Sequence, residues 1–113
     1  MAIQFGPLVV GQSTTGFGPC AGPNQRRGAK TFHVQLTGSG AVSATIQVMV
    51  SNTTASSAVL GNWVTHGTIT ISGTSVVSDG YVAMSPWKFY RPYVSAISGT
   101  NASLDIYVGE ETR

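Results

Sequence analysis

The feature that most constrains the fold is the alternation over residues 42–50, where apolar side chains at the even positions alternate with Ser43, Thr45, Gln47 and Met49. Successive side chains of a strand point to opposite faces, so a period of two predicts a strand with one buried and one polar face. Residues 31–36 repeat the pattern over a shorter span. Strong helix formers are scarce, because glutamate occurs only at Glu110 and Glu111 while Gly, Ser, Thr and Val dominate the chain. We therefore expect an all-β protein.

Further short runs of β-branched and aromatic residues follow, each bounded by turn residues. We expect strands over residues 63–71, 75–77, 81–84, 87–97 and 104–108, with turns at residues 37–40, 72–74, 78–80 and 98–101. The turn at residues 37–40 has the composition of a hairpin. Pro92 cannot donate to a ladder, so its strand should lie at an edge or carry a bulge there. Short strands with frequent turns predict an antiparallel β-sandwich or jelly roll.

The N-terminal part of the chain has a different composition. Residues 1–29 are dense in Gly and Pro, which interrupt any long strand or helix, and only residues 7–10 suit a short strand. Arg26 and Arg27 make this segment basic, because no acidic residue precedes Asp79. Its apolar side chains are more than a plain linker needs, so we expect it to be ordered by packing along a neighbouring subunit or along the surface of a larger assembly. The predicted division is an extended basic arm over residues 1–29 and a β-sandwich domain over residues 30–113.

The composition favours a protein that spends its time in contact with neighbours. Charged residues make up only 9% of the 113 residues, hydrophobic residues make up 42%, and the net charge is +2. This length suits one domain, and the apolar content is too high for a disordered chain. Freely soluble monomers usually carry more charge, and few charges are available here to protect the edge strands of a sandwich. We expect a homo-oligomer, either a dimer or a trimer.

Residues that could carry catalysis are few. A glycosidase-like carboxylate pair would need Asp79 with Asp105, and Asp79 lies in the sequence context of a turn. His33 and His66 alternate with apolar or small neighbours, so both should point to solvent, and neither accompanies a nucleophile motif. The single cysteine, Cys20, can form no intramolecular disulfide and has no metal-ligand spacing around it. We expect no enzyme activity, no catalytic residue, no metal site and no cofactor.

Aromatic and cationic side chains are the best candidates for contact with a partner, because these types dominate interface hot spots. Most aromatic residues lie from Trp63 onward. Two interpretations stay open: the tryptophans anchor the core, or part of the set forms a face that stacks on a sugar or a protein. The cations near the arm are too few to predict a nucleic-acid site. The candidate partner-binding residues are Phe5, Leu8, Phe17, Arg26, Arg27, Lys30, Trp87, Tyr90, Arg91 and Tyr93.

No part of the sequence predicts contact with a membrane. Residues 1–10 lack the basic start of a signal peptide. No apolar stretch approaches the ~20 residues that a membrane-spanning helix needs. The glycosylation sequons at Asn52 and Asn101 therefore predict no modification.

Five segments of the second half combine strand and turn residues in a distinctive order: residues 61–65 (GNWVT), 67–74 (GTITISGT), 78–80 (SDG), 87–94 (WKFYRPYV) and 96–104 (AISGTNASL). This order resembles small structural proteins of tailed bacteriophages, in which the tryptophan, the arginine and the Ile-Ser-Gly-Thr turn recur within a β-sandwich. The resemblance covers about residues 60–109 and includes no catalytic motif, and Pro92 departs from it. It implies a virion component assembled in the host cytoplasm, a capsid decoration or cement protein that binds the major capsid protein and copies of itself. The alternative is a glycan-binding or fibre-associated attachment module.

Overall fold

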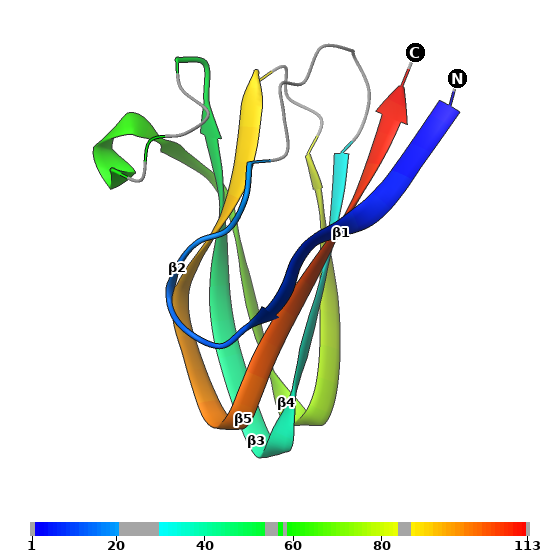
Figure 1. Ribbon diagram of the computed structural model, residues 1–113, viewed down its shortest axis with the longest axis vertical. Helices are drawn as coiled ribbons and strands as arrows, with labels where there is room; N and C mark the ends of the chain where they lie inside the picture. Colours follow the sequence, from blue (N-terminus) through cyan, green and yellow to red (C-terminus); the bar gives the residue numbers. More distant parts are fainter. Residues whose placement is uncertain (1, 21–29, 54–56, 58, 84–86, 113) are drawn as a thin grey trace.

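The computed structural model describes residues 2–20, 30–53, 57, 59–83 and 87–112, and it is built almost entirely of strands (Figure 1). The strands are β1 (Ala2–Gln12), β2 (Gly16–Phe17), β3 (Lys30–Ser51), β4 (Val64–Ala83) and β5 (Phe89–Thr112). A 3-10 turn, η1 (Leu60–Asn62), precedes β4. Every pairing between the strands is antiparallel. The prediction of an all-β, antiparallel fold is confirmed.

The strands form one sheet in the order β1-β5-β3-β4, and β2 adds to β5 beyond this path. β3 is central, because it pairs with β4 on one side and with β5 on the other over nearly its whole length. Val34 of β3, for example, lies between Asp79 of β4 and Ile106 of β5. Because strands far apart in the sequence are hydrogen-bonded side by side, each part of the chain needs the others for the stability of its strands.

The three long strands are folded over near their middles. A straight strand of the 22 residues of β3 would span about 70 Å, whereas the longest extent of the molecule is 41 Å. Each long strand turns back at the same end of the molecule, at the bottom of Figure 1. The sheet therefore consists of two halves. The first half-sheet holds β1 with residues 30–37, 76–83 and 103–112, and the second holds β2 with residues 41–51, 64–74 and 89–98.

The predicted turns at residues 37–40, 72–74 and 98–101 lie at or next to these bends, but they do not make hairpins. The predicted turn at residues 78–80 is wrong, because these residues lie within β4 and pair with residues 33–35 of β3. Residues with positive φ mark the bends, namely Gly40 in β3, Ser75 in β4, and Gly99 and Asn101 in β5. The two arms of β3 pair with β4 and β5 and not with each other. The prediction of a hairpin at residues 37–40 is therefore wrong, because the strand segments on either side of this turn do not pair with each other. Turn residues reveal where the chain changes direction, while the pairing depends on strands far away in the sequence.

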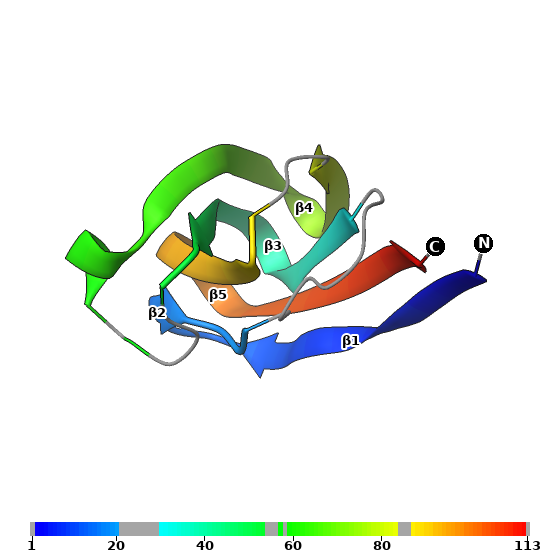
Figure 2. The ribbon, with the colours of Figure 1, turned by 90° about the horizontal axis from the view of Figure 1, so that it is seen from above.

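The core fills the space between the two half-sheets. Along β3 every second side chain is buried, first Phe32, Val34 and Leu36, and then the even-numbered residues 42–50 across the bend. The rings of Phe32 and Tyr90 lie 6.3 Å apart although the two residues are not paired in the sheet, so the half-sheets pack face to face at this point. Figure 2 shows the strands curving around this interior.

The N-terminal residues pair with the C-terminal strand of the same molecule. β1 runs along β5 from Ala2 opposite Thr112 to Gln12 opposite Leu104, a longer strand than the one expected over residues 7–10. An edge strand tolerates Pro7, because one side of β1 needs no hydrogen-bond partner, and the register shifts immediately after it. Residues 2–12 and 16–17 of the predicted arm thus belong to the sheet as β1 and β2, and residues 21–29 lie outside the described residues.

Two neighbouring valines in β1 test whether this segment is integral to the fold. Val9 is buried in the core, and Val10 is 76% exposed. We expect Val9→Ala to lower the free energy of unfolding by about 2 kcal/mol through lost burial and a residual cavity. Val10→Ala should change it by less than about 0.5 kcal/mol. Urea denaturation of both variants measures this difference, and two equally small effects would show that β1 does not pack on the core in solution.

Candidate functional site

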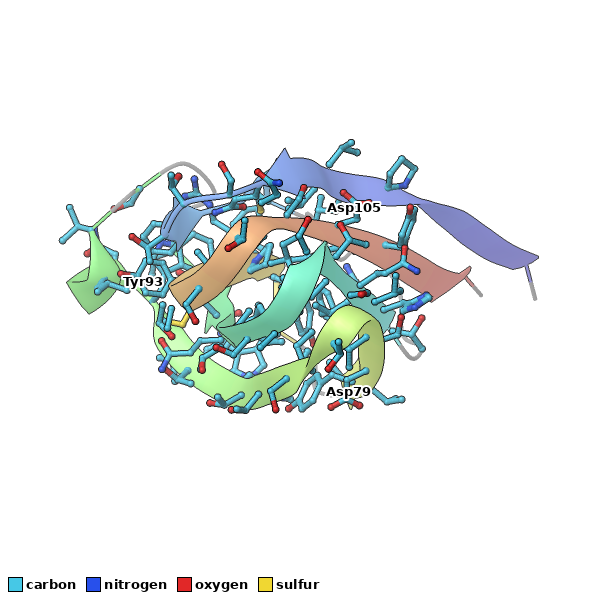
Figure 3. The ribbon with its side chains drawn as sticks, turned by 90° about the horizontal axis from the view of Figure 1, so that it is seen from below. Asp79, Tyr93 and Asp105 are labelled. Carbon is cyan, nitrogen blue, oxygen red and sulfur yellow. The ribbon has the colours of Figure 1, made fainter. Side chains whose placement is uncertain are left out.

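The most structured surface feature is a group of side chains on the outer face of the second half-sheet, which we call the Arg91 cluster: Phe17, Met49, Trp63, Arg91 and Tyr93. Met49 lies opposite Arg91 in the β3–β5 ladder, and Phe17 lies opposite Tyr93 in the β2–β5 ladder. Residues paired directly across antiparallel strands share a face, so these four side chains gather together. Trp63 reaches them from the segment that follows η1. Tyr93 is labelled in Figure 3.

Arg91 occupies the centre of this cluster. Its guanidinium carbon lies 4.5 Å from the centroid of the Phe17 ring and 5.8 Å from that of Trp63. Its Nε donates to the carbonyl oxygen of Gly18 at 2.6 Å, and its Nη1 donates to that of Ser57 at 2.8 Å. The indole Nε1 of Trp63 donates to the same Ser57 oxygen at 2.8 Å. Arg91 thereby ties β2 and the segment before η1 to β5.

The Arg91 cluster is partly open to solvent. Trp63 is only 6% exposed and Met49 is buried, whereas Phe17, Arg91 and Tyr93 are half-buried. Among the side chains that the structure describes, no carboxylate forms an ion pair with Arg91. The large apolar side chains of Val59, Leu60 and Val64, which flank Trp63 in the sequence, are exposed. An arginine held between aromatic rings and bordered by exposed apolar residues is chemically suited to contact a protein surface or a sugar ring.

A second group of polar and aromatic side chains lies between the half-sheets, away from the bends. Lys30 is 1% exposed, and its Nζ lies 4.8 Å from the centroid of the buried Tyr90 ring. Burial raises the pKa of Tyr90 above its ordinary value. Nδ1 of His66 and the hydroxyl of Tyr81 are hydrogen-bonded at 2.6 Å. Lys30 and Tyr90, both predicted to contact a partner, thus present almost no side-chain surface in this structure.

His66 departs from the prediction that both histidines point to solvent. His33 is exposed, but His66 is half-buried, with its ring 5.7 Å from Tyr81 and 6.2 Å from Tyr90. The cause is a shift in register, since Val48 pairs with Gly67 and the next residue, Met49, pairs with Thr65. His66 is the extra residue of this bulge, and a bulge redirects a side chain out of simple alternation.

The other predicted partner-binding residues are dispersed. Phe5 lies in β1 opposite Gly109. Leu8 and Trp87 are partly buried and pack against the core cluster. Arg26 and Arg27 lie outside the described residues. Of the predicted set, the structure brings Phe17, Arg91 and Tyr93 together in one surface cluster and places Lys30 beside Tyr90 inside the molecule.

Sequence reasoning missed two members of the Arg91 cluster. Met49 interrupts the polar side of the alternation over residues 42–50, where the other outward residues are Ser43, Thr45 and Gln47. An apolar residue on an otherwise polar face was the signal that this face is covered locally. The sequence left open whether Trp63 belongs to the core or to an outer face, and the structure buries it in a separate contact on the outer face. Nothing in the sequence identifies the Ser57 carbonyl as the shared acceptor of Arg91 and Trp63.

A shallow groove of about 410 Å³ lies near the bends on the same half-sheet. Three serines form a row across it, because Ser43 of β3 lies opposite both Ser72 of β4 and Ser98 of β5. The hydroxyl oxygens of Ser43 and Ser98 lie 2.7 Å apart. The lining is neutral throughout, with Ala41, Val42, Gly73 and Thr74 completing it. The groove offers hydroxyl groups for hydrogen bonding and no group that titrates near neutral pH.

The acidic residues and Cys20 do not form a reactive constellation in the described parts of the chain. Asp79 lies opposite the core-facing Val34, and Asp105 lies opposite Gln35 on the other face of the sheet, so the two carboxylates are not paired (Figure 3). Asp105 instead accepts a hydrogen bond from the backbone N–H of Gly11 at 2.7 Å, which secures β1. Among the described residues, no three His, Cys, Asp or Glu side chains are placed to hold a metal ion.

Cys20 offers a direct test of the local environment near β5. Burial raises the pKa of its thiol, and the nearby positive charges of Arg91 and Lys30 oppose that rise only in part. Because the thiolate is the reactive form, we expect iodoacetamide at pH 8 to alkylate Cys20 more slowly in the folded protein than in urea. Mass spectrometry of timed samples measures both rates. Equal rates would contradict the burial of this thiol.

No helix among the described residues is long and apolar enough to span a membrane. Comparison with known proteins adds no relative: the chain matches no protein-family model, no curated protein and no solved structure.

Proposed function

We propose that the chain is a non-enzymatic structural protein of a tailed-phage particle, a capsid decoration or cement protein that binds the major capsid protein and copies of itself. The observation that carries the proposal is the Arg91 cluster with its exposed apolar border of Val59, Leu60 and Val64. Such a border, on a chain with only 9% charged residues, suits a surface that is covered by a neighbour. The resemblance of residues 60–109 to phage structural proteins includes this same region.

The test is to count copies of the chain in purified particles. A cement protein covers symmetry-related positions over the whole head, so quantitative mass spectrometry against the major capsid protein should find on the order of hundreds of copies per particle. Absence of the chain from purified particles would overturn the virion assignment. We also propose that the chain is located in the virion after assembly in the host cytoplasm, and the same count tests its presence in the virion.

A variant pair connects the surface to binding. Particles stripped of the chain are mixed with purified protein, and binding is measured by co-sedimentation. Leu60→Asp places a charge on the exposed border of the Arg91 cluster and should reduce binding at least about tenfold, since a charge desolvated at an interface is costly. Val10→Asp alters a valine on β1 that is more exposed than Leu60, and it serves as the control. Equal binding by both variants would place the contact elsewhere.

The second candidate is a glycan-binding or fibre-associated attachment module. The half-buried rings of Phe17 and Tyr93, with centroids 4.8 Å apart, favour it because aromatic rings stack on the apolar faces of sugars. A fibre-associated module should occur at tens of copies per particle, and its loss should lower adsorption to host cells while leaving heads stable. Heads that become fragile while adsorption is retained would support the cement protein.

A further inference from the structure

β4 is an open edge of unusual length and little charge. Over the described residues it pairs only with β3, and it runs for 20 residues. Asp79 is its one charged residue, and it contains neither proline nor lysine, the residues that commonly protect an edge. Val64, Val76 and Val82 are 52%, 59% and 56% exposed. Such an edge presents unpaired backbone groups and apolar surface to a further strand.

The bend gives this edge a particular symmetry. Because β4 folds over with the sheet, residues 64–72 and 76–83 form two arms that run in opposite directions, one in each half-sheet (Figure 1). Viewed from above, β4 follows one side of the molecule and β1 the opposite side (Figure 2). A two-fold axis parallel to the arms would place residues 64–72 of one copy beside residues 76–83 of a second copy, and residues 76–83 of the first beside residues 64–72 of the second. Both contacts are then antiparallel, the arrangement that continues this sheet.

The side chains agree with this arrangement. From Gly67 onward the odd-numbered positions of β4 lie on the core-facing side in both arms: Ile69 and Ile71 are buried in one arm and Ala83 in the other, whereas Asp79 stays exposed. When odd positions of β4 in one copy pair with odd positions of β4 in the other, the core-facing side of each sheet continues into the core-facing side of the next. This pairing puts residue 74 or residue 75 on the two-fold axis. Asp79 then lies opposite residue 69 or 71 of the second copy, so no like charges meet. We propose that β4 is the dimer interface of this protein, with each copy extending both half-sheets of the other.

The size of the edge is adequate for a specific dimer. Its 20 residues match the low end of the roughly 20–30 residues that each partner contributes to a standard interface. Two antiparallel ladders of this length provide on the order of ten main-chain hydrogen bonds, as a typical interface does. This dimer would account for the binding between copies of the chain that the proposed function includes. It does not require that the chain be part of a virion.

Substitution at the axis provides the test. Thr74 is exposed, and in a two-fold dimer its side chain lies close to the Thr74 side chain of the second copy. Thr74→Lys and Thr74→Glu should each raise the dimer dissociation constant about tenfold, because like charges then face each other. An equimolar mixture of the two variants should recover dimer, with the heterodimer dominant in native mass spectra. Circular dichroism verifies that each variant is folded.

Two controls locate the contact. Thr100→Lys adds the same charge at the bend of β5, which is not an edge strand, and Val10→Lys adds it to β1 at the opposite edge. Neither should change the dissociation constant measured by sedimentation equilibrium. Wild-type protein that stays monomeric throughout the concentration series would overturn the proposal, as would a dimer weakened by Val10→Lys and not by Thr74→Lys. These outcomes are independent of particle copy number, so this inference and the virion role can fail separately.

Discussion

Replacing Gly99 by alanine is expected to destabilise the protein by about 3 kcal/mol, the combined effect of backbone strain and overpacking. Gly99 has a φ of +122°, which side-chain-bearing residues rarely adopt. A Cβ at this position would lie 2.7 Å from the carbonyl oxygen of Ala41 and 3.0 Å from the Cα of Val42. Because these neighbours are backbone atoms of the adjacent bend in β3, they cannot move without disturbing that bend. Thermal unfolding should show a melting temperature lower by about 10 °C.

Gly40 is the matched control for Gly99. It has a φ of +81° at the same end of the molecule, but a Cβ there would meet nothing within 4 Å. Gly40→Ala should therefore cost only the backbone term, about 1 kcal/mol. If the two substitutions destabilise equally, the close contact between the bends of β3 and β5 does not exist in solution.

Arg91→Ala is expected to lower the free energy of unfolding by about 3 kcal/mol, because it removes two charge-assisted hydrogen bonds and an aromatic stacking contact. The carbonyl oxygens of Gly18 and Ser57 lose their guanidinium partner, and the rings of Phe17 and Trp63 lose the group between them. Arg91→Lys should recover only part of this stability, since an ammonium group lacks the planar fork that reaches two acceptors. Urea denaturation measures both variants.

The fluorescence of Trp63 reports whether the loss is local. In a Trp87→Phe background Trp63 is the single tryptophan, and its emission should shift to longer wavelength when Arg91 is removed. Lys88→Ala is the control, because Lys88 is exposed, its Nζ lies 5.3 Å from the centroid of the Phe89 ring, and its hydrogen bond to Oδ1 of Asn52 is made by the backbone N–H, which alanine keeps. It should change stability by less than about 0.5 kcal/mol. Similar effects of Arg91→Ala and Lys88→Ala would show that Arg91 does not hold β2 and the segment before η1 against β5.

The sequence predicted the strands well where burial alone decides the conformation. The alternation over residues 42–50 identified the core-facing side of β3, and the Gly and Ser clusters marked the bends. The inward turn of His66 was not predictable, because it follows from a register shift between β3 and β4 that only their pairing creates. The extent of β1 was missed for a related reason. Its partner is β5, about a hundred residues later, and Gly and Pro look like breakers until that edge position is known.

The candidate site was predictable only in part. Phe17, Arg91 and Tyr93 were chosen by residue type, and the structure places them together. Tyr90 has the same chemistry as Tyr93 but faces the core, because strand residues an odd number of positions apart point to opposite faces. The sequence could not tell which of the two faces inward, because Pro92 left the register of β5 open. The Arg91 cluster also requires carbonyl groups from two separate segments, and residue type alone cannot locate these.

The pairing of β1 with β5 has a consequence for how the chain folds during synthesis. Ala2 pairs with Thr112, and residues 30–37 of β3 pair with residues 103–110, so strands made early have no partner until these residues of β5 leave the ribosome. Only β3 and β4 can pair beforehand, and they would do so with the β5 side of β3 uncovered. The sheet therefore cannot be completed before β5 has been made, and closing such distant contacts is slow. Until then the nascent chain exposes an apolar strand edge, which makes capture by a chaperone or by a second nascent copy the main competitor of correct folding.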